Sequence, residues 1–148
     1  MSVDLKITPV LQGRNSNYCV PYTALTILNH YLTNPPSIKS LIVDTKASRK
    51  GGAFVDNFKD TLNFYGFKIR RLAFAKILYA LKRGNPVVIG YKYGVNESHL
   101  SLISGYFKDK GITYFILSDS WYGKITLPKK ILEVVVRADG SYIREILT

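Results

Sequence analysis

Residues 19–32 have the sequence CVPYTALTILNHYL, and this stretch decides the fold. Leucines recur along it at helical spacing and form an apolar stripe: Leu25, Leu28 and Leu32. Pro21 fits the first turn of such a helix, because an N–H group at that position has no helical partner. The pattern therefore predicts a helix over 19–32, ended by the asparagine and two prolines at 34–36.

The rest of the chain changes from helical to β-rich patterns at about residue 86. Apolar residues beginning with Phe54 and with Phe74 predict two more helices, ended by Gly66 and Gly84, with a short strand over 67–72 between them. Four β-rich stretches follow: Val87–Ile89, His99–Tyr106, Ile112–Leu117 and Ile125–Leu127. Helices first and antiparallel strands afterwards predict an α+β fold, with N-terminal helices packed on an antiparallel sheet.

The last part of the chain is expected to form a short helix opened by Pro128 and a terminal hairpin that turns at Asp139-Gly140. With 148 residues, the whole chain fits one compact domain over 1–148. Hydrophobic residues make up 47% and charged residues 21%, which is the composition of a globular protein rather than a disordered one.

Neither a membrane span nor a secretory signal is predicted. The longest apolar stretches, Pro86–Gly90 and Ile131–Val136, are too short to cross a bilayer. The N-terminus lacks the charged start and apolar core of a signal peptide. A cytoplasmic location is therefore expected.

The charge balance is strongly basic, with 21 Lys and Arg against 10 Asp and Glu and a net charge of +11. Such a balance favours an acidic partner, such as nucleic acid, an anionic membrane surface or an acidic polypeptide. The basic residues are scattered in pairs, however, and no nucleic-acid-binding motif occurs. A solvated basic surface is the alternative interpretation.

Cys19 is the only cysteine, which excludes an internal disulfide. One cysteine and two histidines are too few for a tetrahedral zinc site without carboxylates, and no metal or other cofactor is expected. Cys19 lies where a polar loop enters the predicted helix, and the N–H groups and helix dipole there favour the nucleophilic thiolate. It is a candidate nucleophile, although a cysteine at a helix start can also be buried and inert.

A thiolate nucleophile needs a base, and the sequence offers only His30 and His99. His30 follows Cys19 by eleven residues on the same helix, so the two lie about 16 Å apart, too far for proton transfer. His99 remains, and it begins a predicted strand.

The strand of His99 is joined to the next strand by a tight, glycine-containing turn. If Phe107 pairs with Ile112, His99 lies opposite Ser120, and a one-residue bulge would put it opposite Asp119. Either register brings a carboxylate within reach of the imidazole.

Two interpretations of this pair are possible. His99 and Asp119 could simply end two strands at a polar edge of the sheet. With Cys19 at a helix start as the third member, the residues favour a Cys-His-Asp triad for nucleophilic catalysis.

Short motifs also occur in a defined order along nearly the whole chain. They are Gln12, CVPYTAL at 19–25, Gly51-Gly52, GNPVVI at 84–89, Ser98-His99-Leu100, Ser104-Gly105-Tyr106, Leu117-Ser118-Asp119 and Gly123. Their order resembles that of papain-like cysteine peptidases, most closely the double-glycine leader (bacteriocin-processing) peptidase group. The stretch DSWYG at 119–123 also resembles the Asn-Ser-Trp-Gly segment of papain itself.

The resemblance implies a papain-like cysteine peptidase fold and a role for each matched residue. Cys19 would attack a carbonyl carbon, His99 would accept and return the proton, and Asp119 would fix the imidazole tautomer. Gln12 would donate its side-chain amide to the oxyanion, together with the Cys19 backbone N–H. An exposed loop residue is the alternative interpretation of Gln12.

Substrate binding is assigned to Trp121, Tyr18 and Val20, although aromatic side chains at such positions can equally be packed in the core. The chain departs from the family pattern at three points. Val20 replaces the usual glycine, the Gln12–Cys19 loop is one residue longer, and Ser120 replaces a proline.

Together, the residues and the resemblance predict a thiol-dependent peptidase that cleaves a peptide or protein substrate, with related acyl transfer left open. Cleavage after a double glycine is not established by the sequence. The alternative is a catalytically inactive papain-like domain that binds a peptide or nucleic acid through its basic surface.

Overall fold

The computed structural model describes residues 2–13, 16–49, 52–53, 55–94 and 97–148. Gly51 and Phe54, used in the sequence patterns above, lie outside these residues. The helices are α1 (Cys19–Tyr31), α2 (Ile38–Asp44), α3 (Val55–Phe64), α4 (Ile77–Lys82), which a 3-10 turn (Phe74–Lys76) precedes, and α5 (Lys129–Ala138). The strands are β1 (Val3–Asp4), β2 (Lys68–Arg71), β3 (Val87–Gly94), β4 (Glu97–Asp109), β5 (Ile112–Asp119), β6 (Gly123–Pro128) and β7 (Ile143–Leu147).

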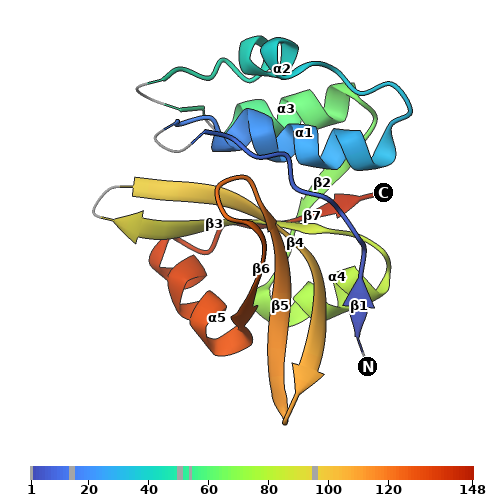
Figure 1. Cartoon of the computed structure of the whole chain (residues 1–148), viewed down its shortest axis with the longest axis vertical. Coiled ribbons are helices and arrows are strands. Elements are labelled where there is room, and N and C mark those ends of the chain that lie inside the picture. Colours follow the sequence, from blue (N-terminus) through green and yellow to red (C-terminus); the bar gives the residue numbers. More distant parts are fainter. Residues whose placement is uncertain (1, 14–15, 50–51, 54, 95–96) are drawn as a thin grey trace.

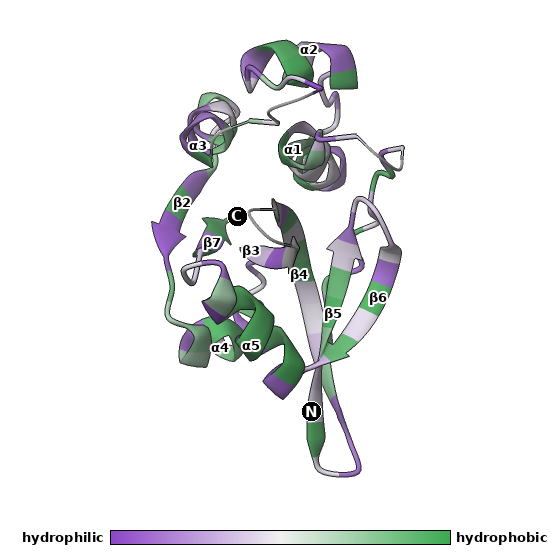
Figure 2. Cartoon of the chain, turned by 90° about the vertical axis from the view of Figure 1, so that its left-hand side faces the viewer, coloured by the Kyte–Doolittle hydropathy of each residue, from purple (hydrophilic) through white to green (hydrophobic). Residues whose placement is uncertain are grey.

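The strands form one antiparallel sheet in the order β2-β7-β3-β4-β5-β6, and β1 pairs with β4. Helices α1, α2 and α3 gather on one side, whereas α4 and α5 lie against another part of the sheet (Figures 1 and 2). The predicted α+β arrangement, with N-terminal helices on an antiparallel sheet, is present.

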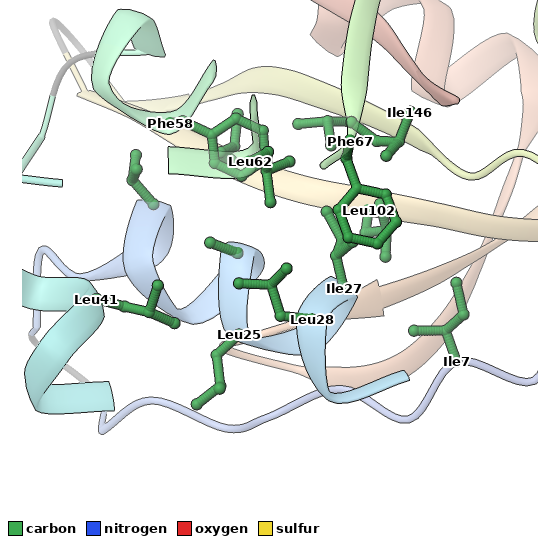
Figure 3. Close-up of a cluster of buried hydrophobic side chains, with 14 residues drawn as sticks. Ile7, Leu25, Ile27, Leu28, Leu41, Phe58, Leu62, Phe67, Leu102 and Ile146 are labelled. Carbon is green, nitrogen blue, oxygen red and sulfur yellow. The ribbon is translucent and has the colours of Figure 1, made fainter. Parts of the chain in front are cut away.

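Two apolar clusters hold these layers together. Val88, Leu100 and Leu102 pack with residues of α1 and α3, and Figure 3 shows this cluster. On β3, the neighbouring residues Val87 and Ile89 belong instead to a second cluster with residues of α4 and α5. Because successive strand residues point to opposite faces, this division shows that β3 is covered on both sides, which explains its continuous apolar sequence.

The predicted terminal hairpin is wrong. Asp139 and Gly140 end α5, and the chain then runs into β7, which inserts between β2 and β3. The buried carboxylate of Glu145 on β7 binds Arg70 at 2.9 Å, Arg83 at 2.8 Å and Asn85 at 2.8 Å. These partners outweigh the effect of burial, which alone would raise the pKa of Glu145, and lower that pKa below its usual value.

The predicted register of β4 and β5 is also wrong. Asp109 pairs with Ile112, so Lys110 and Gly111 form a two-residue turn, with φ values of 49° and 80°. The bulge lies farther along, where the pairing skips Ser104. The neighbouring glycine, Gly105, lies so close to β1 that a Cβ atom there would be 2.3 Å from the carbonyl oxygen of Val3.

The predicted helices over 19–32 and 74–81 and the helix after Pro128 are confirmed within a few residues. Helix α2 and strand β1 were not predicted. Ser37 caps α2 by accepting a hydrogen bond of 3.1 Å from the Ser40 backbone N–H. No helix within the described residues is long and apolar enough to cross a membrane.

Candidate active site

Helix α1 presents Cys19 at its first position, and its inner face is anchored in the core by Val20, Ala24 and Leu28. Thr23 donates a hydrogen bond of 3.4 Å to the Leu100 carbonyl oxygen, which ties the first turns of α1 to β4. Cys19 itself is half-buried. The N-terminus of α1 is thereby held against the strand that carries the candidate base.

His99 and Asp119 are in direct contact. His99 Nε2 lies 3.1 Å from Asp119 Oδ2 and 3.2 Å from Oδ1, and both side chains are buried. The observed pairing of Leu102 with Ser118, extended by one residue, puts Ser101 opposite Asp119, the last residue of β5. Asp119 therefore reaches His99 as a diagonal neighbour on the same face of the sheet, rather than from the directly opposite position.

Four further donors hold the Asp119 carboxylate. Ser101 Oγ donates to Oδ2 at 2.7 Å, and the Tyr91 hydroxyl donates to the same atom at 3.2 Å. The backbone N–H groups of Trp121 and Tyr122 donate to Oδ1 at 2.7 and 3.0 Å. Burial alone would raise the pKa of Asp119, but His99, Ser101 and the Trp121 amide together lower it to about 2.

The imidazole of His99 is enclosed by aromatic rings. Trp121 stacks on it with ring centroids 3.9 Å apart, and the Tyr91 ring meets it edge-on at 5.3 Å. Burial opposes a charge on the imidazole, yet hydrogen bonds and charges from Asp119 and Cys19 raise the pKa of His99 to about 9. Asp119 contacts Nε2 of this ring, and Cys19 is the second residue whose interactions favour the charged imidazole.

Cys19 and His99 also line one cavity of about 310 Å³. Its remaining described lining residues are Val20, Ala53, Val55, Gly90, Ser98, Leu100, Asp139 and Tyr142. Cys19 and His99 therefore border the same hollow, whose walls are mostly apolar.

Gln12 is buried and is hydrogen-bonded to Ser120, the residue after Asp119. Its backbone N–H donates to the Ser120 carbonyl oxygen at 2.8 Å, and its side-chain oxygen accepts a hydrogen bond from the Ser120 hydroxyl. Its side-chain N–H₂ group donates to the carbonyl oxygen and the hydroxyl of Ser16, at 2.9 and 2.8 Å. Gln12 is thus an ordered residue, not an exposed loop residue, and its part in an oxyanion hole stays a prediction.

The three predicted substrate-binding residues have different surroundings. Val20 is buried and lines the cavity, Tyr18 is the half-buried N-cap of α1, and Trp121 packs on His99. Their roles stay predictions. Sequence reasoning missed Ser101, whose signal is its position two residues after His99, on the same face of a strand that is otherwise apolar there.

The geometry agrees with a comparison against known families. The profile of the peptidase C39-like family matches residues 4–139. The chain belongs to this family. The predicted resemblance to the double-glycine leader peptidase group is thereby confirmed, as is the prediction that the enzyme is a cysteine peptidase.

Two solved structures show how widely the fold of this C39-like peptidase is shared. One is a double-glycine-motif protease from an AMS/PCAT transporter in complex with the leader peptide. This protease is 19% identical to the chain, and the match covers 99% of this chain and 95% of that chain with a TM-score of 0.72. The other is the peptidase domain of Streptococcus ComA, a bifunctional ABC transporter involved in quorum sensing, at 17% identity, 95% and 96% coverage and a TM-score of 0.75. No curated protein sequence matches the chain. The structural matches confirm the predicted fold class.

Proposed function

We propose that this C39-like peptidase hydrolyses peptide bonds through Cys19, His99 and Asp119. The observation that carries the proposal is the position of the His99 imidazole, which has the Asp119 carboxylate at Nε2 and lines one cavity together with Cys19. A nucleophile, a base and a residue that orients the base are the parts that covalent acyl chemistry requires.

In the first step, the Cys19 thiol gives its proton to His99, which becomes an imidazolium. Sγ then bonds to the carbonyl carbon of the substrate, and the π electrons move to the carbonyl oxygen. The C–N bond then breaks as the His99 imidazolium gives its proton to the departing amine, which leaves a thioester on Cys19. Water attacks this thioester while His99 takes one of its protons, and the carboxylic acid product and the thiol are released. Asp119 stays ionised throughout, because its donors lower its pKa to about 2.

The oxyanion formed on attack needs hydrogen-bond donors. The Cys19 backbone N–H lies at the first position of α1, where no helical acceptor exists for it. Gln12 is proposed as the second donor, and this role requires its side-chain amide to exchange one of its hydrogen bonds to Ser16 for the oxyanion.

The substrate is proposed to be a peptide or an extended segment of a protein. The related transporter protease binds a leader peptide, and the cavity beside Cys19 has the mostly apolar walls that a peptide side chain can fill. A cytoplasmic location, where the thiol stays reduced, is part of this proposal.

Cleavage of a mixed peptide library, followed by mass spectrometry, tests the function. Wild type is expected to cleave, whereas Cys19→Ala and His99→Ala should each lose at least about a thousandfold in rate. His30→Ala is the matched control, since His30 is an exposed histidine of the same helix as Cys19, and it should retain full activity. Circular dichroism and thermal unfolding would show that the variants remain folded.

The same experiment separates the alternatives. Products that carry an added amine in place of a carboxylic acid would identify acyl transfer through the same thioester. Cleavage that survives Cys19→Ala, or the absence of cleavage in a folded wild type, would contradict the proposed peptidase mechanism.

A further inference from the structure

Asp139 is a charged residue of the Cys19–His99 cavity that the proposed mechanism does not use. It lines this cavity together with the apolar side chains of Val20, Val55 and Leu100. In a chain with a net charge of +11, this carboxylate lines the same cavity as the candidate nucleophile. The proposed mechanism gives this charged group no role.

The carboxylate is held in place by two contacts with the strands. Ser98, the neighbour of His99, donates a hydrogen bond to Oδ1 of Asp139. Oδ2 lies against Gly90, where a Cβ atom would be only 2.7 Å away. Glycine at position 90 therefore leaves the space that the carboxylate occupies, and the Asp139 side chain has a defined position.

This position is electrostatically unfavourable for an acidic residue. Asp139 is the C-cap of α5, and the carbonyl end of a helix carries a partial negative charge that favours cations. The cation in the last turn, Arg137, pairs with Glu133 and not with Asp139. Within the described residues, no ion pair involves Asp139.

Basic residues occur in the same region, but within the described residues none of them forms an ion pair with Asp139. Arg71 and Arg144 line an adjoining cavity of about 450 Å³ that shares Asp139 and Tyr142 with the first. Arg144 lies over the Tyr142 ring, 4.3 Å from its centroid, and Lys92 pairs across the strands with Ser98. The structure thus leaves the carboxylate hydrogen-bonded by Ser98 but available to a cation that enters the Cys19 cavity.

From this arrangement we propose that Asp139 determines specificity and selects substrates with a positively charged group, on an apolar stem, close to the bond that is cut. The stem of a lysine or arginine side chain would pack against Val20 and Leu100, and its ammonium or guanidinium group would meet the carboxylate. This inference rests on the proposed function, because it assumes that the cavity beside Cys19 receives the substrate.

Binding measured on the Cys19→Ala variant tests the proposal without requiring turnover. Fluorescence anisotropy would compare the binding of peptides that differ at a single position. The varied position would be each of the four residues on either side of a bond that is cleaved in the library. If no bond is cleaved, each position of a fixed test peptide would be varied instead. At one position, lysine should give about tenfold tighter binding than norleucine, which has a similar stem without the charge. Acetylated and free N-termini would distinguish a side-chain cation from a terminal ammonium group as the bound cation.

Adding Asp139→Asn to Cys19→Ala should abolish the preference for lysine, and Asp139→Lys should replace it by a preference for glutamate. Asparagine keeps an acceptor for Ser98, so the local packing is preserved. Asp109→Asn is the matched control, because Asp109 is exposed at the far end of β4 and its loss changes the net charge equally. No preference at any position, or one that survives Asp139→Asn, would overturn the proposal.

The two proposals can fail separately. Cysteine-dependent cleavage with no preference for a cation would overturn the role of Asp139 and leave the peptidase function intact. A preference for lysine in binding that depends on Asp139, without any cleavage by wild type, would support the Asp139 site and contradict the peptidase function.

Discussion

Ser101 donates a hydrogen bond of 2.7 Å to Asp119 Oδ2, and this is the same carboxylate oxygen that lies 3.1 Å from His99 Nε2. Ser101 and His99 are two residues apart on β4 and share one face of the strand. Strand β4 therefore carries both the candidate base, His99, and Ser101, which positions the Asp119 carboxylate against that base.

Ser101→Ala removes this donor while leaving the Trp121 and Tyr122 amides on the other carboxylate oxygen. We expect turnover to fall about tenfold and the free energy of unfolding to fall by about 1–2 kcal/mol, because a hydrogen bond to a buried charge is lost. Peptide cleavage and urea unfolding would measure the two effects. Ser104→Ala is the control, since Ser104 is buried on the same strand and bonds Ser118; an equal loss of turnover there would contradict a specific role for Ser101.

The ring of Trp121 covers one face of the His99 imidazole at 3.9 Å. Trp121→Ala should admit water to the His99–Asp119 pair, with a loss of about 2 kcal/mol in unfolding free energy and a loss of at least tenfold in turnover. Trp121→Phe should retain most of the turnover. Tyr122→Ala removes the adjacent, largely exposed ring and should have little effect, and a Trp121→Ala enzyme with wild-type turnover would show that the stacking is not needed.

A substitution at Gln12 tests the proposed oxyanion hole. Gln12→Glu keeps an acceptor for the Ser120 hydroxyl but removes the amide donor, so we expect kcat to fall about a hundredfold with little change in KM. Ser16→Ala removes one acceptor that holds the amide in the resting structure and should not lower kcat. A folded Gln12→Glu enzyme with full kcat would exclude Gln12 as an oxyanion donor.

The ionisation of His99 predicts how stability changes with pH. Burial alone would lower its pKa, but Asp119 and Cys19 raise it from 6.5 to about 9, so folding favours the protonated imidazole. Its contribution to stability should be complete below about pH 6.5 and should be lost as the pH rises to about 9. Urea unfolding at several pH values measures this contribution as the difference in free energy of unfolding between wild type and His99→Gln. A difference that grows between pH 6.5 and 9 would contradict the assignment.

The ionisation of Asp119 predicts the opposite trend, a loss of stability as the pH falls. Burial opposes its charge, but its donors lower its pKa from 3.8 to about 2. Its contribution should be complete above about pH 4 and should be lost as the pH falls to about 2. The difference in unfolding free energy between wild type and Asp119→Asn should therefore shrink in acid, and a constant difference from pH 5 to pH 2 would contradict this.

The features that could be predicted from sequence are those set by local patterns. The leucine spacing, Pro21 and the prolines at 35–36 define α1 to within one residue at its C-terminal end, and they place Cys19 at its start. The elimination of His30 used only helix geometry. For these reasons His99 could be named as the candidate base before the fold was known. Asp119 was named from a hairpin register that is wrong in detail, although its contact with His99 is present.

The parts that were missed depend on contacts between distant segments. The register of β4 and β5 follows from a left-handed lysine, Lys110, and from a bulge at Ser104, and neither has a clear sequence signal. The pairing of β7 with β3 was hidden because Glu145, in the middle of β7, is charged yet fully buried. Only its distant partners Arg70, Arg83 and Asn85 make that burial favourable.

The most direct test of the account is whether Cys19 becomes covalently attached to the substrate during cleavage. Wild type would be mixed with a peptide that it cleaves, quenched in acid within milliseconds to seconds, and measured by intact-protein mass spectrometry. We predict an added mass equal to the N-terminal product minus one water, located on Cys19 by fragmentation and absent in Cys19→Ala. Cleavage of the same peptide at an undiminished rate by Cys19→Ala, without an adduct in wild type, would contradict the account.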